Sequence, residues 1–205
     1  MKIAVYGGTG NIGSAIVAEA VRRGHQVTAL ARHEQPAPEG ATFVLGDAAD
    51  ADAAREVAAS HDVVVSALGP TRDPAGDPDR FVEVIRSLAD SVGPTRLVVV
   101  GGASSLFAAP GVRLLDTPEF PEAYKREARS GIAAFDFLRE DARPDLDWTY
   151  LSPAPEIGPG ERTGKYLLGL DEPVGEHITI PDYAVALVDE IETPQHGRRR
   201  FTVAN

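Results

Sequence analysis

A run of glycines between an apolar segment and an amphipathic one constrains the fold of this chain more than any other feature. The apolar run from Ile3 to Tyr6 is followed by Gly-Gly-Thr-Gly-Asn-Ile-Gly over residues 7–13, and apolar residues then recur at helical spacing. A strand, a tight glycine turn and a helix in this order are typical of dinucleotide binding. Glycine permits positive φ and leaves room for a pyrophosphate at the helix N-terminus, where free N–H groups favour an anion.

The residues after the second predicted strand, His25 to Ala31, indicate which dinucleotide is bound. NAD-selective sites place an acidic side chain there, about 20 residues after the glycines, to bind the ribose 2′-hydroxyl. Here Arg32 and His33 follow the strand, and Glu34 comes slightly late. A guanidinium pairs well with a 2′-phosphate, so we expect NADP(H) to be preferred over NAD(H). The alternative is that Arg32 and His33 are solvated loop residues.

Strand-like and helix-like segments alternate along the rest of the chain. Further strands are expected over 41–45, 62–66, 96–100 and 147–151, and helices over 51–60, 79–92 and 122–143. The last forty residues are expected to form a short strand, a helix and a closing strand. The pattern predicts an α/β fold with a doubly wound, mostly parallel sheet, in a single domain over residues 1–205. The part from about 150 to 205 is expected to complete the substrate pocket.

Composition excludes several classes of partner. A net charge of −11 disfavours nucleic acid, and the dense basic run Arg198 to Arg200 is expected on an edge strand, where charge discourages pairing between chains. The chain has no cysteine, and no apolar run approaches the roughly 20 residues of a membrane span. The five histidines lack the spacing of metal ligands. We therefore expect a cytoplasmic protein without a metal site, membrane contact or nucleic-acid partner.

Several motifs together resemble a known family. They are the glycine run, Arg32 after the second strand, Gly46-Asp47 after the third, Ser-Ala-Leu-Gly over 66–69 and Val-Gly-Gly-Ala-Ser-Ser-Leu over 100–106. The chain resembles the atypical short-chain dehydrogenases of the NAD(P)H-binding, NmrA-like group, and is most similar to the NADH-flavin reductase-like and biliverdin reductase B-like proteins. The resemblance extends nearly end to end and implies an NAD(P)-binding Rossmann fold.

The resemblance also implies roles for the motif residues. The pyrophosphate would be held by the glycine turn, through Gly7, Thr9, Gly10, Asn11, Ile12 and Gly13. Arg32 would hold the 2′-phosphate, and the adenine would be bordered by Asp47 and Ala48. The remaining cofactor contacts would be Ala67, Leu68 and Gly69 beside the ribose, and Gly102 and Ala103 near the nicotinamide. The alternatives are a turn cap for Asp47 and close backbone packing for Gly101 and Gly102.

The sequence departs from the wider superfamily in one informative respect. Catalytic short-chain dehydrogenases reduce carbonyls with a Tyr-x-x-x-Lys pair, and none of the five tyrosines here has a lysine four residues later. An acceptor that delocalises the incoming electrons needs only orientation beside the nicotinamide. Ser104 is the best candidate for a hydrogen bond to substrate or carboxamide, and Tyr124 is a candidate outer donor. The alternatives are a turn cap for Ser104 and a solvated helix face for Tyr124.

These observations predict an NADPH-dependent oxidoreductase that passes hydride to a flavin, quinone or similar conjugated acceptor, a flavin reductase-like activity. A second interpretation is a non-enzymatic NADP(H) sensor, in which segment 69–78 or 103–121 becomes ordered on binding and changes a protein interface. A third is a tailoring reductase or isomerase that acts on a biosynthetic intermediate. The sequence leaves open whether the chain forms a homodimer and whether residues 106–121 form a lid or an interface.

Overall fold

The computed structural model describes residues 1–71, 73, 75–77 and 79–205. Its main strands are β1 (Lys2–Tyr6), β2 (Gln26–Ala31), β3 (Thr42–Leu45), β4 (Val63–Ser66), β5 (Arg96–Val100), β8 (Trp148–Pro153), β10 (Leu167–Gly169) and β12 (Arg199–Ala204). Its α-helices are α1 (Asn11–Arg22), α2 (Ala51–Ser60), α3 (Arg80–Ser91), α4 (Lys125–Glu140) and α5 (Ile180–Glu192). Strands and helices thus alternate over most of the chain, as the sequence predicts.

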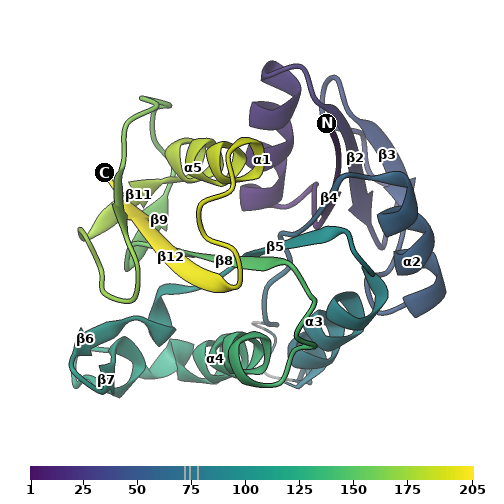
Figure 1. The fold of residues 1–205 in the computed structure, drawn as a ribbon. Helices are drawn as coiled ribbons and strands as arrows, with labels where there is room; N and C mark the ends of the chain where they lie inside the picture. Colours follow the sequence, from purple (N-terminus) through teal and green to yellow (C-terminus); the bar gives the residue numbers. More distant parts are fainter. Residues whose placement is uncertain (72, 74, 78) are drawn as a thin grey trace.

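The main strands form one eight-stranded sheet in the order β10-β12-β8-β5-β4-β1-β2-β3, with helices on both faces (Figure 1). Neighbouring strands run parallel, apart from β10, which is antiparallel to β12. The chain builds outward from β1 to β3 on one side and then from β4 onward on the other. The predicted doubly wound, mostly parallel α/β sheet is confirmed.

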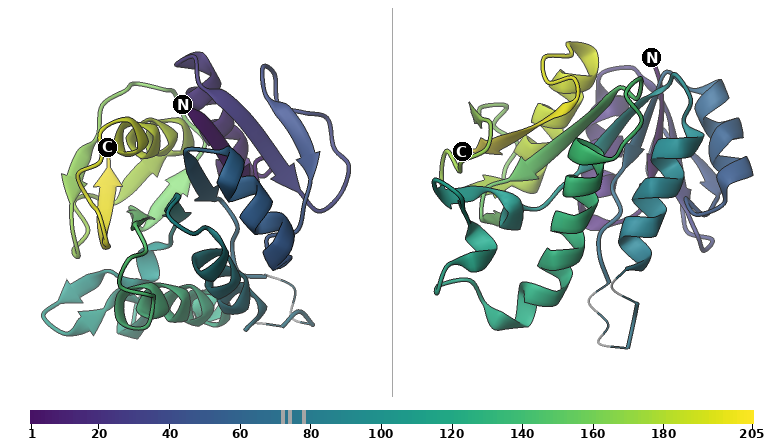
Figure 2. Two further views of the ribbon diagram at one scale, coloured as in Figure 1. Left: turned by 45° about the vertical axis from the view of Figure 1, so that its right-hand side comes forward. Right: turned by 60° about the horizontal axis from the view of Figure 1, so that its bottom comes forward.

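Alternating side chains of the central strands supply two apolar cores, one on each face of the sheet. Ile3 and Val5 of β1 pack with residues of α1 and α5, whereas Ala4 and Tyr6 pack with residues of α2, α3 and α4. Figure 2 shows α2, α3 and α4 side by side across one face. Because both faces are covered, an inner strand such as β4 is apolar along nearly its whole length.

The arginine run near the C-terminus does not lie on an edge strand, so that expectation is wrong. Strand β12 lies between β8 and β10, and Arg200 is only 3% exposed. Its guanidinium donates hydrogen bonds to Asp171 Oδ1 and Ser105 Oγ, and it lies 4.5 Å from the ring centroid of Phe135. The charge is compensated inside the protein by Asp171, which follows β10, while β10 itself pairs with residues 202–204 of β12.

Short elements occupy the segments that the sequence left as loops. Residues 106–121 contain the antiparallel pair β6 (Phe107–Ala109) and β7 (Val112–Arg113), followed by the 3-10 helix η2 (Leu114–Asp116). Two further short strands, β9 (Glu156–Gly158) and β11 (His177–Thr179), pair in parallel. The last forty residues therefore hold two short strands before α5, β10 and β11, rather than one.

The 69–78 segment, predicted to respond to the cofactor, contains Arg72, Pro74 and Pro78, which lie outside the described residues. The helix expected over 122–143 is divided into the 3-10 helix η3 (Glu122–Tyr124) and α4. In the part of the chain that the structure describes, no helix is long and apolar enough to cross a membrane.

Candidate functional site

A cavity of about 590 Å³ opens where β1, β2, β3 and β4 reach their carboxyl ends. Doubly wound sheets bind ligands at this edge, at the point where the strand order reverses, which here lies between β1 and β4. The volume falls within the roughly 300–1,000 Å³ typical of small-molecule sites. The predicted cofactor residues in its lining are Gly7, Thr9, Gly10, Arg32, Asp47, Ala48, Ala67, Leu68 and Gly69.

The glycine turn packs so closely that side chains would disrupt it. Gly7 has φ of 75°, and a Cβ added to it would lie 2.7 Å from the carbonyl oxygen of Ala67. A Cβ on Gly13 would lie 2.0 Å from the carbonyl oxygen of Gly7, which also accepts the N–H of Gly10 at 2.9 Å. The first turn of α1 therefore packs directly against the backbone of Gly7, and it carries no acidic residue. The arrangement suits the binding of a phosphate group.

Two groups of predicted cofactor residues lie outside the lining of this cavity. Asn11, Ile12 and Gly13 form the first turn of α1, where Ile12 packs against the core. Gly102 and Ala103 lie beyond the carboxyl end of β5, at the same edge of the sheet. The structure therefore gathers the expected ribose and adenine residues and half of the expected phosphate residues in one cavity, and it leaves the expected nicotinamide residues outside the lining.

The side chain of Arg32 is exposed at the cavity wall, directly after β2. No carboxylate of the described residues lies within 4 Å of its guanidinium. A second arginine of the wall, Arg80 at the start of α3, lies 3.5 Å from the carboxylate of Glu83. Arg32 is thus the less constrained of the two cations, and its donors remain available for a ligand.

Asp47 caps a turn and also lines the cavity, so its position is compatible with both roles that the sequence left open. Its Oδ1 accepts the backbone N–H of Ala49 at 3.0 Å, which stabilises the turn, and the residue also lines the cavity. Three residues later, Asp50 accepts the N–H groups of Asp52 and Ala53 and begins α2. Of these two aspartates, only Asp47 lines the cavity.

Sequence reasoning missed Tyr6, which lines the cavity and is 2% exposed. Its hydroxyl has no hydrogen-bond partner among the described residues. Burial raises the pKa of Tyr6 to about 12, and the charges of Asp50 and Asp47 contribute to the rise. The available signal was its position directly before the first glycine. Loop and helix residues after β4 were missed as well, namely Thr71, Arg80, Phe81 and Val84.

The turn after β5 places Ser104 in the 3-10 helix η1 (Ala103–Ser105). Ser104 is 9% exposed, and no hydrogen bond to its hydroxyl is formed by the described residues. The carbonyl of Gly102 accepts the Ser152 hydroxyl at 3.0 Å, which fixes the start of the turn. Close packing explains Gly101, whose added Cβ would lie 2.0 Å from the ring of Tyr150, but it does not explain the open position of Gly102.

Tyr124 lies in η3 with 52% of its surface exposed. No described residue forms a hydrogen bond with its hydroxyl. The neighbouring Lys125 pairs with Glu122 at 2.7 Å. Tyr124 therefore lies on a solvated surface, as the alternative interpretation expects. The structure does not join it to Lys125 as an acid–base pair.

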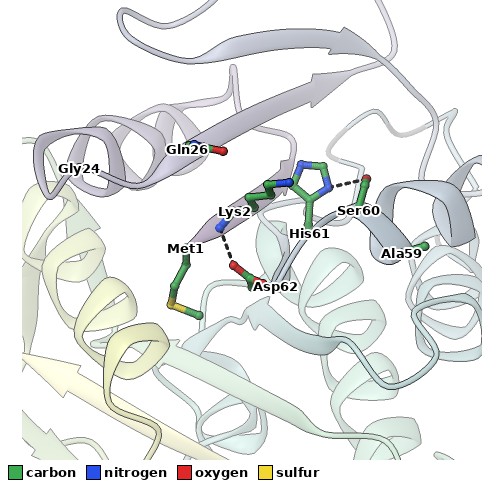
Figure 3. A pocket seen from close by; sticks show the side chains of 8 residues that line it. All are labelled: Met1, Lys2, Gly24, Gln26, Ala59, Ser60, His61 and Asp62. Atoms are coloured by element: carbon green, nitrogen blue, oxygen red, sulfur yellow. Dashed lines mark hydrogen bonds between the residues drawn. The ribbon is translucent and has the colours of Figure 1, made fainter.

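A second hollow, of about 520 Å³, lies at the opposite edge of the sheet, around the amino ends of β1 and β4 (Figure 3). Several of its polar groups are hydrogen-bonded within the protein. Asp62 accepts the backbone N–H of Lys2 at 2.7 Å, and the His61 ring lies between the Val57 carbonyl and the Thr28 hydroxyl. This hollow lacks a glycine turn or helix N-terminus. The cavity at the carboxyl edge is therefore the candidate functional site.

Comparison with known proteins agrees with this site. The chain belongs to the NAD(P)H-binding family, whose model matches residues 7–194. It is 38% identical to the uncharacterized protein YwnB of Bacillus subtilis over 217 residues, with 100% of this chain and 99% of the relative covered. The family supports a nicotinamide cofactor.

Two solved structures share the whole fold. One, described as a "putative exported protein" from Burkholderia pseudomallei, matches with a TM-score of 0.89 and 41% identity, and both chains are fully covered. The other, described as a "putative NADH-flavin reductase" from Streptococcus pneumoniae, matches with a TM-score of 0.90 and 35% identity over 100% of this chain and 99% of that chain. The resemblance to an NAD(P)H-binding family that the sequence showed is therefore confirmed.

Proposed function

We propose that the protein is an NADPH-dependent oxidoreductase that delivers a hydride to a flavin, quinone or similar conjugated acceptor. The observation that carries the proposal is the cavity at the carboxyl edge, in which a close-packed glycine turn and the exposed guanidinium of Arg32 share one wall. A dinucleotide with a 2′-phosphate fits this site, because the glycine turn would hold the pyrophosphate and the exposed guanidinium would hold the 2′-phosphate.

The residues present fit such a cofactor. The turn from Gly7 to Gly13 and the N-terminus of α1 would hold the pyrophosphate, and Arg32 would hold the 2′-phosphate. Asp47 and Ala48 would border the adenine, and residues 67–69 would lie along the ribose. When bound, the reduced nicotinamide supplies the hydride.

The contribution of the chain itself is mainly positional. Gly102 leaves open space beside Ser104, whose free hydroxyl would orient the carboxamide or the acceptor. Burial raises the pKa of Tyr150 to about 12, and burial holds the pKa of Tyr183 well above its ordinary value. A proton donor for ketone reduction needs the opposite shift. An acceptor that stabilises the added electron pair within its own conjugated system fits this site better.

The segment from about 150 to 205 would complete the acceptor pocket. Ser152 of β8 holds the carbonyl of Gly102, and Arg200 of β12 holds the hydroxyl of Ser105, so both strands support the turn that carries Ser104. In this proposal the acceptor is a small conjugated molecule bound next to that turn.

The test is the anaerobic loss of NADPH absorbance in the presence of FMN, riboflavin or small quinones, with purified protein. Turnover that depends on an acceptor and disappears in the Gly13→Asp variant supports the proposal. NADPH binding without turnover on any of these acceptors would overturn it, in favour of the sensor or of a tailoring enzyme with another substrate.

A further inference from the structure

Strand β10 forms one end of the sheet, and its exposed surface is apolar. In the part of the chain that the structure describes, eight large hydrophobic side chains are exposed, and three of them lie within residues 167–170. Leu167 is 59% exposed, Leu168 55% and Leu170 48%. Single exposed leucines are ordinary, whereas a cluster of them on the surface of a soluble protein marks an interaction site.

The backbone of β10 is also open on its outer side. The strand pairs with β12 on its inner side, and no other strand of the described sheet pairs with it. Open edges recruit further strands, so natural proteins protect them with charged side chains or prolines. The sequence of β10, Leu-Leu-Gly over 167–169, contains neither. An edge that is both apolar and unpaired is suited to pair with another strand.

Charges on either side of β10 indicate that the other strand is β10 of a second copy. Lys165 lies two residues before the strand and Asp171 two residues after it. When two copies pair antiparallel about Leu168, Lys165 of each copy lies opposite Asp171 of the other, because residues equally far from the two-fold axis face each other.

Both charged groups have the capacity for this contact. Lys165 is exposed and forms no ion pair with any residue that the structure describes. Asp171 is 59% exposed, and both of its hydrogen bonds from Arg200 go to Oδ1, which leaves Oδ2 available. The segment from Lys165 to Asp171 is therefore complementary to a second copy of itself.

The opposite edge of the sheet lacks this self-complementarity. Strand β3 exposes Val44 and Leu45, so it is apolar as well. The nearest charged residues on either side of it are Glu39 and Asp47, and both are acidic. Two copies paired at β3 would bring like charges together, which disfavours association there.

We propose that β10 is the interface of a homodimer, in which two copies join their sheets antiparallel about a two-fold axis at Leu168. Leu168 of one copy lies beside Leu168 of the other, and a Lys165–Asp171 pair forms at each end. The interface is small, so we expect a weak dimer with a dissociation constant of about 10–100 µM. The inference goes beyond the proposed function and depends on neither the cofactor nor the acceptor.

The first experiment measures molar mass by sedimentation equilibrium from about 1 µM to about 1 mM protein, a range that brackets a weak interface. The wild type should change from monomer to dimer. Leu168→Asp, which places two carboxylates together on the axis, should remain monomeric. The matched control is Leu45→Asp, because Leu45 is 59% exposed on the other edge strand, and it should dimerise as the wild type does. Thermal unfolding of dilute samples should show that both variants fold.

The second experiment tests the register by cross-linking. The chain has no cysteine, so Leu168→Cys introduces a single thiol. Opposite residues of an antiparallel pair have Cα atoms about 4.5–5.5 Å apart, which suits a disulfide. Under mild oxidation, Leu168→Cys should form a covalent dimer much faster than Leu45→Cys, which is exposed on the edge without a partner.

Lys165→Glu tests the charge pairs that select the second copy. It places a carboxylate opposite Asp171 at both ends of the interface, so dimerisation should weaken about three- to tenfold. Lys2→Glu changes an exposed lysine at the amino edge of the sheet and should leave dimerisation unchanged.

Three results would overturn the inference. They are a wild type that stays monomeric at every concentration, a Leu168→Asp variant that dimerises as the wild type does, and equal cross-linking rates for Leu168→Cys and Leu45→Cys. A dimer that is lost in Leu45→Asp would place the interface at β3 and overturn it as well. None of these outcomes bears on NADPH turnover, so the proposed function stands or falls separately.

Discussion

The guanidinium of Arg200 donates a 2.8 Å hydrogen bond to the hydroxyl of Ser105, although the two residues lie 95 positions apart in the chain. The same guanidinium donates twice to Asp171 Oδ1, and the backbone N–H of Phe107 donates to the Asp171 carbonyl. Arg200 thereby joins the turn that carries Ser104 to the segment that follows β10.

Asp171→Asn should destabilise the protein, because it removes the charge that balances the buried Arg200. Asp171 is itself 59% exposed, so solvent screens part of the attraction, and we expect a loss of about 1–2 kcal/mol in the free energy of unfolding. The control is Asp145→Asn, whose partner Arg143 is less buried and whose own side chain is 78% exposed. Urea unfolding that gives equal losses for both variants would contradict a structural role for the Arg200 pair.

Arg32→Ala should weaken NADPH binding about tenfold to a hundredfold, as expected for the loss of a charge-assisted hydrogen bond to phosphate. NADH binding should change little, because that cofactor lacks the 2′-phosphate. Arg55→Ala removes another exposed arginine, from α2, and should alter neither affinity. Equal losses for NADPH and NADH in fluorescence titrations would show that Arg32 does not read the 2′-phosphate.

The same glycine-to-alanine change should have opposite effects at two positions. At Gly13 the new methyl group would collide with the carbonyl of Gly7, so we expect lost cofactor binding and lower stability. At Gly131, inside α4, an added Cβ meets nothing within 4 Å, and alanine should stabilise the helix by about 0.5–1 kcal/mol. Thermal unfolding of both variants, with and without NADPH, checks the contrast; a tolerated Gly13→Ala would refute the close-packed turn.

Ser104→Ala should lower turnover and leave the dissociation constant of NADPH nearly unchanged, if its free hydroxyl orients the reacting groups. The control, Ser60→Ala, lies at the opposite edge of the sheet (Figure 3) and should preserve turnover. Steady-state turnover is measured for both variants with the flavin or quinone that gives the wild type its highest rate. Full activity in Ser104→Ala would leave this turn without a role in orientation.

Glu19 should make the protein sensitive to acid. It is 4% exposed, and although burial alone raises its pKa, hydrogen bonds from Arg162, Arg22 and Arg23 outweigh burial and hold that pKa well below the ordinary value of 4.5. A carboxyl whose folded pKa is lowered stabilises the protein above its unfolded pKa, and this contribution is lost as the pH falls toward the folded value.

Glu19→Gln should therefore be less stable than the wild type at neutral pH but should lose less stability on acidification below the unfolded pKa. Glu140→Gln, which changes an exposed residue, should follow the wild-type pH profile. Urea unfolding at a series of pH values measures both. If the free energy of unfolding changed with pH in the same way for the wild type and for Glu19→Gln, the lowered pKa of Glu19 would be contradicted.

Local pattern was sufficient to predict the central strands and helices and part of the cavity lining. The segment over 51–60 is the helix that the sequence predicts, and the strand over 96–100 has the predicted bounds, because both signals depend on neighbouring residues. The glycine turn could be located for the same reason. Its chemistry requires glycines at fixed spacing next to a strand and a helix.

The features that could not be predicted from the sequence depend on contacts between residues far apart in the chain. Arg200 was misplaced because nothing near it in the chain reveals that β12 lies between β8 and β10, or that Asp171 pairs with its guanidinium. Tyr6 was overlooked because its apolar neighbours in β1 make it look like an ordinary core residue. Its unpartnered hydroxyl becomes visible only when the loop after β3 and helix α3 are placed around it.

The insertion of β12 between β8 and β10 also imposes an order on assembly. Strand β10 precedes β12 in the chain, yet within the described sheet it pairs with β12 alone. Its three residues therefore gain sheet hydrogen bonds only through β12, and they are the first to lose them when that edge opens. In native-state hydrogen exchange, the amides of β10 should open before those of β12, so the sheet closes in an order different from that of the sequence.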